Sequence, residues 1–450
     1  MNYSQAIEYL DSFVNYERTS NYSYQYCLNL QRFVNFLNLI GNPHKGLKVI
    51  HVAGTKGKGS TSAFITYILR AAGFKVGLYT SPHLSDFRER IRVLIQSSKF
   101  KVQSYDFEGM ISQKDICDLV SKLKPAIDRF NKNSQYGDLT FFEVYTAVAF
   151  QYFKDKKVDF AVLETGLGGR LDATNVCSSL ISVITPISLE HTYLLGKTIA
   201  EIAFEKASII KKENCILENG KRIILSARQD KDAMAVIEKV AKKNNAVLLK
   251  ESRDFQFKIK RNNTFDYRGV NCLNNLKINL LGAHQVANAS LAIAAVEVLS
   301  YYDVEIGEEA IRNGLKNCRW PARFEIISKS PLVVLDGAQN QASVETLSKT
   351  IKEFFPSRKV WMIFGIAKDK ELKDTCRAAE KITKNIILTK SANPRACEPK
   401  DLLKYFKTNS QIITNNSQEA LEAAKRRVAK DDIILTTGSL YVCGELRKSF

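Results

Sequence analysis

The sequence contains no apolar run that approaches the length needed to cross a membrane. Its first residues lack the basic region and apolar stretch of a secretory signal, and residues 1–13 instead show apolar side chains at helical spacing. The nine cysteines are dispersed and form no CxxC pair, which disfavours a disulfide framework and favours reduced thiols. Together these absences predict a cytoplasmic protein with no membrane partner.

Acidic residues are too few to balance the basic ones. The chain has 66 Lys and Arg residues against 47 Asp and Glu, which gives a formal net charge of +19. The cations are spread along the chain and are not concentrated in one arm. A basic surface suits either a nucleic acid or the steering of small anionic substrates, so charge alone leaves both interpretations open.

Strands and helices alternate through most of the 450 residues. Apolar runs predict strands at residues 47–53, 75–80, 159–165 and 180–186, and helical periodicity predicts helices at 60–72, 141–154 and 198–212. Residues 255–281 alternate between polar and apolar side chains and predict a small antiparallel addition to the sheet. A helix is predicted after it, at residues 284–302. From residue 324 the β/α alternation restarts.

This pattern predicts an α/β protein with two domains. The first is a P-loop ATPase-like domain with a mostly parallel sheet and the small antiparallel addition. The second is a Rossmann-like α/β domain of ordinary size. We expect the first domain at residues 1–318, a linker at 319–323, and the second domain at 324–450.

A glycine-rich segment lies between the first predicted strand and the helix after it. It consists of Gly54, Thr55, Lys56, Gly57, Lys58, Gly59 and Ser60. Glycines let backbone amides approach phosphate oxygens closely, and a helix N-terminus favours an anion. Lys58 is placed to meet nucleotide phosphates, and the Ser60 hydroxyl to bind Mg²⁺. The common GxxxxGK[ST] pattern is not satisfied, because Gly59 separates the lysine from the hydroxyl. The alternative is a glycine-rich turn with a solvated lysine.

This loop resembles that of the folylpolyglutamate and dihydrofolate synthases in the Mur ligase superfamily. The resemblance covers nearly the whole chain, because further family segments follow in the expected order. They are residues 80–84, 89–91, 164–175, 281–285, 288–289, 320–323, 336–340 and 437–441. Several motifs in one order are far more specific than any of them alone.

The resemblance implies a set of site residues. Those implied to bind ATP are the loop residues 54–60 together with Asn288, Arg323 and Asp336. Those implied to contact the substrate are Ser81, Pro82 and His83, and those with catalytic roles are Lys58, His191 and Lys206. The implied Mg²⁺ ligands are Ser60, Glu164, His191 and Lys206, the last as a carbamate formed with CO₂. Without the resemblance, the better prediction for His191 is a structural histidine, and for Lys206 a solvated lysine.

The sequence departs from the family pattern at two places in or near the second domain. Gln339 stands where the family usually has a histidine, and Ala322 replaces a glycine of the WPGR segment. Glutamine can donate a hydrogen bond to a phosphate, but it cannot carry charge or titrate. The resemblance therefore does not assign Gln339 the role of that histidine.

The resemblance implies an ATP-dependent ligase that adds L-glutamate to the carboxylate of folates through an acyl phosphate. Whether dihydropteroate is also a substrate stays open. The expected cofactors are ATP and Mg²⁺, with a monovalent cation such as K⁺ as a further candidate, and the expected state is a monomer. The alternatives are a cell-wall Mur ligase and a basic P-loop ATPase that binds nucleic acid. No RNA-binding signature supports the last, and we expect no nucleic-acid partner.

Overall fold

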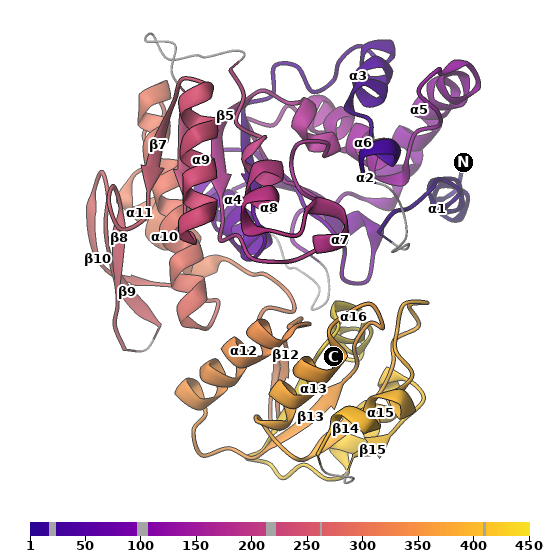
Figure 1. Ribbon diagram of the computed structural model, residues 1–450, viewed down its shortest axis with the longest axis vertical. Helices are drawn as coiled ribbons and strands as arrows, with labels where there is room; N and C mark the ends of the chain where they lie inside the picture. The colour runs from indigo at the N-terminus through magenta and orange to yellow at the C-terminus, as the bar shows by residue number, and fades with distance from the viewer. Residues whose placement is uncertain (18–23, 97–106, 213–221, 262, 408–410) are drawn as a thin grey trace.

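The computed structural model describes residues 1–17, 24–96, 107–212, 222–261, 263–407 and 411–450. Three sheets organise the chain (Figure 1). We call the first two sheets with their helices the N-terminal unit, and the third sheet with its helices the C-terminal unit. No helix in the described ranges has the length and apolar character of a membrane span.

The large sheet has seven strands in the order β3-β2-β4-β1-β5-β6-β7. Its strands are β1 (Val49–Ala53), β2 (Val76–Tyr79), β3 (Ile91–Leu94), β4 (Phe160–Glu164), β5 (Ser179–Ile184), β6 (Arg222–Ser226) and β7 (Ala246–Lys250). All neighbours are parallel except β3, which runs antiparallel to β2 at the edge. The carboxyl ends of the parallel strands therefore meet at one edge, where α/β proteins bind ligands.

Helices cover both faces of this sheet, because its central strands are apolar on both sides. One face packs against α4 (Lys58–Ala71), α10 (Ala283–Glu297) and α11 (Glu308–Asn317). The other packs against α1 (Tyr3–Asp11), α3 (Leu30–Leu39), α5 (Gln113–Asn133), α6 (Phe141–Lys156), α8 (Ile199–Ala207) and α9 (Lys231–Lys243). Short helices are α2 (Tyr24–Cys27), α7 (Thr192–Leu195), η1 (Phe87–Arg90), η2 (Ala173–Val176) and η3 (Val298–Tyr302).

The predicted antiparallel addition is a three-stranded sheet of β8 (Gln256–Ile259), β9 (Thr264–Arg268) and β10 (Cys272–Lys277). The C-terminal unit is a six-stranded sheet in the order β11-β12-β16-β13-β14-β15. Its elements are β11 (Glu325–Lys329), β12 (Leu332–Leu335), α12 (Gln341–Phe354), β13 (Val360–Phe364), α13 (Leu372–Glu380), β14 (Ile386–Leu388), α14 (Pro399–Leu402), η4 (Leu403–Tyr405), β15 (Ile412–Ile413), α15 (Ser417–Lys425), β16 (Ile433–Thr437) and α16 (Leu440–Arg447).

The predicted fold class is confirmed, although some element boundaries differ. Helix α8 ends at Ala207, not at residue 212, and the chain then turns inward, where Ile209 and Ile210 are buried. The helix predicted at 284–302 is regular only to Glu297 and continues as η3. Helix α5, which contains Pro125, and the strands β6 and β7 have no counterpart among the predicted elements.

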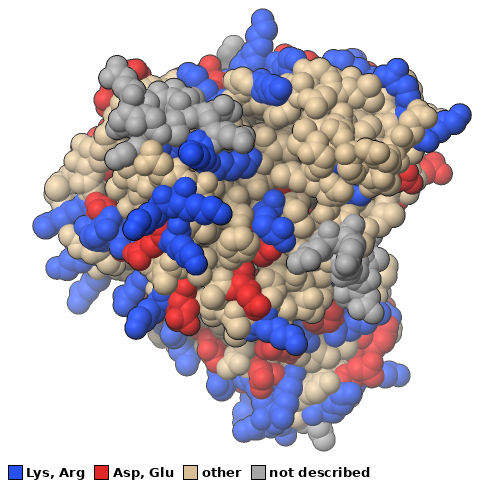
Figure 2. Space-filling model, turned by 45° about the horizontal axis from the view of Figure 1, so that its top comes forward, with Lys and Arg blue, Asp and Glu red and all other residues tan. Residues whose placement is uncertain are grey.

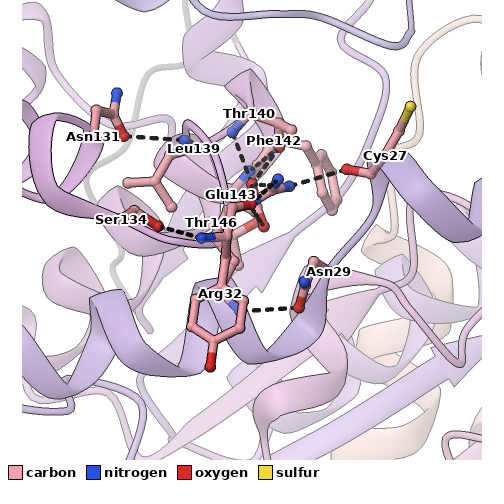
Figure 3. Close-up of polar contacts among 11 residues, drawn as sticks. Cys27, Asn29, Arg32, Asn131, Ser134, Leu139, Thr140, Phe142, Glu143 and Thr146 are labelled. Carbon is pink, nitrogen blue, oxygen red and sulfur yellow. Dashed lines mark hydrogen bonds and ion pairs between the residues drawn. The ribbon is translucent and has the colours of Figure 1, made fainter.

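A buried ion pair joins α3 to the start of α6 (Figure 3). The guanidinium of Arg32 lies 2.9 Å from the Glu143 carboxylate, and both side chains are more than nine-tenths buried. The Glu143 carboxylate also accepts hydrogen bonds from the Thr140 amide and hydroxyl, while Arg32 donates to the carbonyls of Cys27 and Tyr136. Burial raises the pKa of Glu143, and the Arg32 charge opposes that rise. Each charge is therefore stable in the interior only because the other is present.

We expect Glu143→Ala to lower the free energy of unfolding by about 3–5 kcal/mol, because it leaves the buried Arg32 charge without its partner. The matched control is Asp118→Ala, which breaks the exposed Lys114–Asp118 pair on α5 and should leave the free energy of unfolding almost unchanged. Urea denaturation followed by circular dichroism measures both. Equal losses for the two variants would contradict the structural role of the buried pair.

Candidate active site

The glycine-rich segment forms the turn between β1 and α4. Gly54 and Gly57 have positive φ angles of 147° and 85°. A Cβ atom at Gly57 would lie 2.3 Å from the Asn288 side-chain oxygen, and one at Gly54 would lie 1.9 Å from the Thr185 hydroxyl. The N-cap of α4 is Gly57, and no side chain caps this end. The first amides of α4 are therefore available to an anion, as a phosphate loop requires.

Lys58 and Glu164 meet at the carboxyl edge of the sheet. Glu164 is the last residue of β4, in register with Val52 of β1, and its carboxylate lies 3.9 Å from the Lys58 ammonium. The side chain of Glu164 is buried, and burial raises its pKa to about 7, while the charges of Lys58 and Arg323 and a hydrogen bond from the Ser81 amide oppose the rise. A cation at this edge would stabilise the ionised carboxylate.

Lys206 is buried beside the same loop. Only 4% of the residue is exposed, and its ammonium donates a 2.8 Å hydrogen bond to the Gly54 carbonyl oxygen. Burial, with the nearby Lys58 charge, lowers the pKa of Lys206 to about 7. In the described part of the chain no carboxylate forms an ion pair with it. A large share of Lys206 is therefore neutral near physiological pH, which the expectation of a solvated lysine did not anticipate.

His191 precedes α7 in the loop that follows β5. Its φ of 54° is positive, and its ring is partly buried. Burial lowers the pKa of His191 to about 4, although the neighbouring Glu190 carboxylate acts in the other direction. That carboxylate pairs with Lys56 of the phosphate loop at 2.9 Å. The His191 imidazole is thus neutral and can offer a nitrogen lone pair.

The segment at residues 164–175 acts mainly as a scaffold. The Asp172 carboxylate accepts hydrogen bonds from the amides of Gly166 and Leu167 and from Thr174. A Cβ atom at Gly169 would lie 2.7 Å from the Glu205 carbonyl oxygen of α8, so glycine allows the loop to contact that helix. This contact places the end of β4 against the helix that carries Lys206.

A cavity of about 240 Å³ lies between the two units beside this edge. From the N-terminal unit it is lined by Asn29, Ser81, Pro82, Thr140, Phe142, Leu167, Leu171, Asp172 and His191, among others. From the C-terminal unit it is lined by Gln339, Lys370, Arg395, Ser439 and Tyr441, among others. Apolar walls with a few converging polar groups are typical of a small-molecule site.

The three residues implied to contact the substrate do not all lie at this cavity. Ser81 and Pro82 line it, whereas His83 does not and instead accepts a 2.9 Å hydrogen bond from Arg90. Thr140 and Phe142, at the start of α6, were not predicted. The capping box formed by Thr140 and Glu143 was the available signal, because it marks a helix end at this edge.

Of the residues outside the loop that are implied to bind the nucleotide, Asn288 lies against the loop, whereas Arg323 lies just before β11 and Asp336 just after β12. The Asn288 amide lies against Gly57 and donates to Gln285 at 3.0 Å. The Asp336 carboxylate accepts hydrogen bonds from the amides of Phe324 and Ala338, so it also shapes the turn after β12. Burial raises the pKa of both Glu164 and Asp336, and the Arg323 charge opposes the rise in each, which places that charge within reach of both units.

The donor set fits a magnesium ion carried by phosphates. Among the described residues, no three His, Cys, Asp or Glu side chains form a preformed metal cluster. The Glu164 carboxylate and the buried Ser60 hydroxyl lie at the loop and are hard oxygen donors. Mg²⁺ is usually held by one or two carboxylates together with substrate phosphates and water, so a full protein cage is unnecessary.

The surface does not gather its positive charge at one place on the face shown in Figure 2. Lys and Arg side chains lie there among Asp and Glu side chains and do not form one patch on this face. This arrangement offers no continuous basic stripe on that face for a nucleic-acid backbone.

Comparisons with known proteins agree on one family. The chain matches the Mur ligase middle domain at residues 129–296 and the Mur ligase glutamate ligase domain at residues 322–440. It is 35% identical to dihydrofolate synthase/folylpolyglutamate synthase of Bacillus subtilis, over 93% of this chain and 94% of that protein.

Two solved structures show the same fold over their full length. Mycobacterium tuberculosis folylpolyglutamate synthase complexed with ADP has a TM-score of 0.86 and 28% identity, and the match covers 99% of this chain and 98% of that one. An FPGS–AMPPCP–folate complex has a TM-score of 0.80 and 31% identity, over 100% and 99% of the two chains. The chain therefore belongs to the folylpolyglutamate synthase and dihydrofolate synthase family of the Mur ligases.

Proposed function

We propose that this protein uses ATP to activate the carboxylate of a folate and joins it to the amino group of L-glutamate. The observation that carries the proposal is the cavity between the two units, which adjoins a phosphate loop and the buried groups Glu164 and Lys206. Membership of an ATP-dependent acid–amino-acid ligase family supports the same conclusion, as do relatives solved with ADP and with AMPPCP and folate.

The cavity suits the pteridine end of a folate. Phe142, Leu167 and Leu171 offer apolar surface to a flat ring, while Asn29 and Asp172 offer polar groups to its edge. Dihydropteroate carries the same ring, and the Bacillus subtilis relative is named for both activities. We therefore propose that dihydropteroate is also accepted and is converted to dihydrofolate.

The chemistry runs in two steps. A carboxylate oxygen attacks the γ-phosphorus of ATP, and the bond between that phosphorus and the bridging oxygen breaks. ADP departs as the leaving group, and the substrate carboxylate has become an acyl phosphate. The glutamate amine then attacks the carbonyl carbon, loses a proton, and expels phosphate. Lys58 and Arg323 stabilise the charge on the transferring phosphoryl group. The two units together exclude water, which would hydrolyse the acyl phosphate.

Mg²⁺, when bound, neutralises charge on the nucleotide phosphates; Ser60, Glu164 and His191 would hold it, with Lys206 as a carbamate. A neutral amine is the form that attacks CO₂, and the lowered pKa of Lys206 supports its carbamylation. Asn288, Asp336 and the amides of residues 54–60 bind the rest of the nucleotide. We also propose that residues 319–323 form the linker between domains at 1–318 and 324–450; the position of all six strands of the six-stranded sheet after this segment supports the proposal.

The deciding experiment measures ADP release with dihydropteroate and with tetrahydrofolate, each with and without L-glutamate. We expect release that requires glutamate with both acceptors. Glutamate-dependent release with tetrahydrofolate but not with dihydropteroate would restrict the activity to chain extension. ADP release that does not depend on either acceptor but is stimulated by nucleic acid would overturn the proposal.

We expect Lys58→Ala to lower ligation at least about 10³-fold while the fold persists, because the variant loses the charge that meets the transferring phosphoryl group. Steady-state ADP release and far-UV circular dichroism measure the two effects. Lys45→Ala removes an exposed lysine just before β1 and serves as the matched control, with unchanged turnover. Near-normal turnover in a folded Lys58→Ala protein would exclude the phosphate-loop assignment.

Lys206→Met should stabilise the protein while it abolishes ligation. The folded-state pKa of Lys206, about 7, lies below its ordinary value of 10.5, so protonation costs folding free energy as the pH falls from 10.5 to 7. In CO₂-free buffer at pH 7 we expect a gain of roughly 2–4 kcal/mol, which shrinks as the pH rises toward 10.5. Urea denaturation at several pH values tests this. Lys197→Met, at an exposed position just before α8, should show no such pH-dependent gain. The same pH profile for both variants contradicts the expectation.

Gln339 should act as a neutral hydrogen-bond donor, because the attacking carboxylate is already ionised near neutral pH and needs no base. Gln339→Ala should weaken the use of ATP by about 1–3 kcal/mol, through an unpaired buried partner. Gln339→His should be nearly silent. Both variants are assayed for kcat/KM across pH. A large gain in the histidine variant that titrates near its pKa would show that charge matters there.

A further inference from the structure

A second cavity, of about 450 Å³, lies where the linker leaves the N-terminal unit. Its walls come from α4, β3 and residues 279–281 on one side and from β11 and the end of α16 on the other. None of its lining residues lines the substrate cavity, and it shares only Arg323 with the residues proposed for ATP. It is therefore a separate space between the same two units.

Arg92 of β3 lies in the wall of this cavity with an unused donor. The residue is only 1% exposed. Its Nε donates to the Glu108 carbonyl at 2.7 Å, and its Nη2 lies 3.5 Å from the Tyr67 hydroxyl. Its Nη1 is buried and has no hydrogen-bond partner among the described residues. A buried donor without an acceptor is costly and rare, so this group calls for an acceptor.

The charges around the cavity leave an excess of cations. Its two carboxylates are already engaged, since Glu108 pairs with Arg70, and Glu325 pairs with Arg447 at 3.0 Å. Arg319 is exposed at the cavity and forms no ion pair within the described ranges. Arg92 and Arg319 thus contribute positive charge that no acidic side chain in the walls neutralises. An anion is the ligand that fits.

Aromatic side chains form flat walls beside these arginines. The guanidinium of Arg92 lies 5.5 Å from the centre of the Phe107 ring and 5.9 Å from that of Trp320. Trp320 also contacts the phosphate loop, because a Cβ atom at Gly59 would lie 2.9 Å from its ring. A ligand in the cavity would therefore touch a side chain that rests directly on the phosphate loop.

We propose that this cavity is a second binding site, which takes a small molecule bearing a carboxylate or phosphate group through Arg92 and Arg319. The ligand bridges the two units at the linker and contacts Trp320. The site goes beyond the proposed ligase activity, because its ligand is not consumed and its occupancy is measured by binding alone.

The chain offers a built-in probe for the test, because it has only two tryptophans. Trp361 lies in β13, and the nitrogen of its indole has no partner among the described residues, so Trp361→Phe removes no hydrogen bond within them. In that background the fluorescence comes from Trp320. AMPPCP with Mg²⁺ first saturates the phosphate loop. Inorganic phosphate and glutarate are then titrated separately, against chloride at matched ionic strength.

We expect a saturable change in Trp320 fluorescence with at least one of the two anions. Arg319→Ala and Arg92→Met should each weaken the apparent affinity at least 10-fold, whereas Arg129→Ala, at an exposed position on α5, should leave it unchanged. A fluorescence response to only one of the two anions identifies the group, phosphate or carboxylate, that the site prefers. No saturable change with either anion, or full affinity in Arg319→Ala, overturns the proposal even if Arg92→Met fails to fold. Neither result bears on the ligase activity.

Discussion

The hydrogen bond from the Lys206 ammonium to the Gly54 carbonyl ties helix α8 to the phosphate loop, and much of the site depends on it. It brings a buried amine to the carboxyl edge of the sheet, beside Lys58. Helix α8 in turn holds the loop after β4, through the close approach at Gly169 and the ion pair between Arg170 and Glu205. One buried lysine thus fixes three segments relative to one another.

Burial is the common physical cause of the unusual protonation in this region. It raises the pKa of Glu164 and lowers the pKa values of Lys206 and His191, because water is excluded where the strands end. These groups are neutral, or close to neutral, without a ligand. Such poised groups suit a site that must accept the negative charge of a nucleotide and a carboxylate.

The substrate cavity depends on a different interaction, the buried pair between Arg32 and Glu143. That pair fixes the beginning of α6, and so it fixes Thr140 and Phe142 in the cavity wall. The opposite wall belongs to the C-terminal unit, which meets the N-terminal unit again at the second cavity near Trp320. Both cavities therefore depend on how the two units are placed.

The sequence by itself determined the alternation of strands and helices, the phosphate loop, and the order of the family motifs. These features are local, because a glycine turn between a strand and a helix is encoded by adjacent residues. Only the tertiary structure decided that Lys206 is buried against Gly54, that Arg32 faces Glu143, and that Arg92 keeps a free donor. The partners in the first two pairs are 152 and 111 residues apart along the chain. Their charges and pKa values follow from burial, which arises only when distant segments pack together.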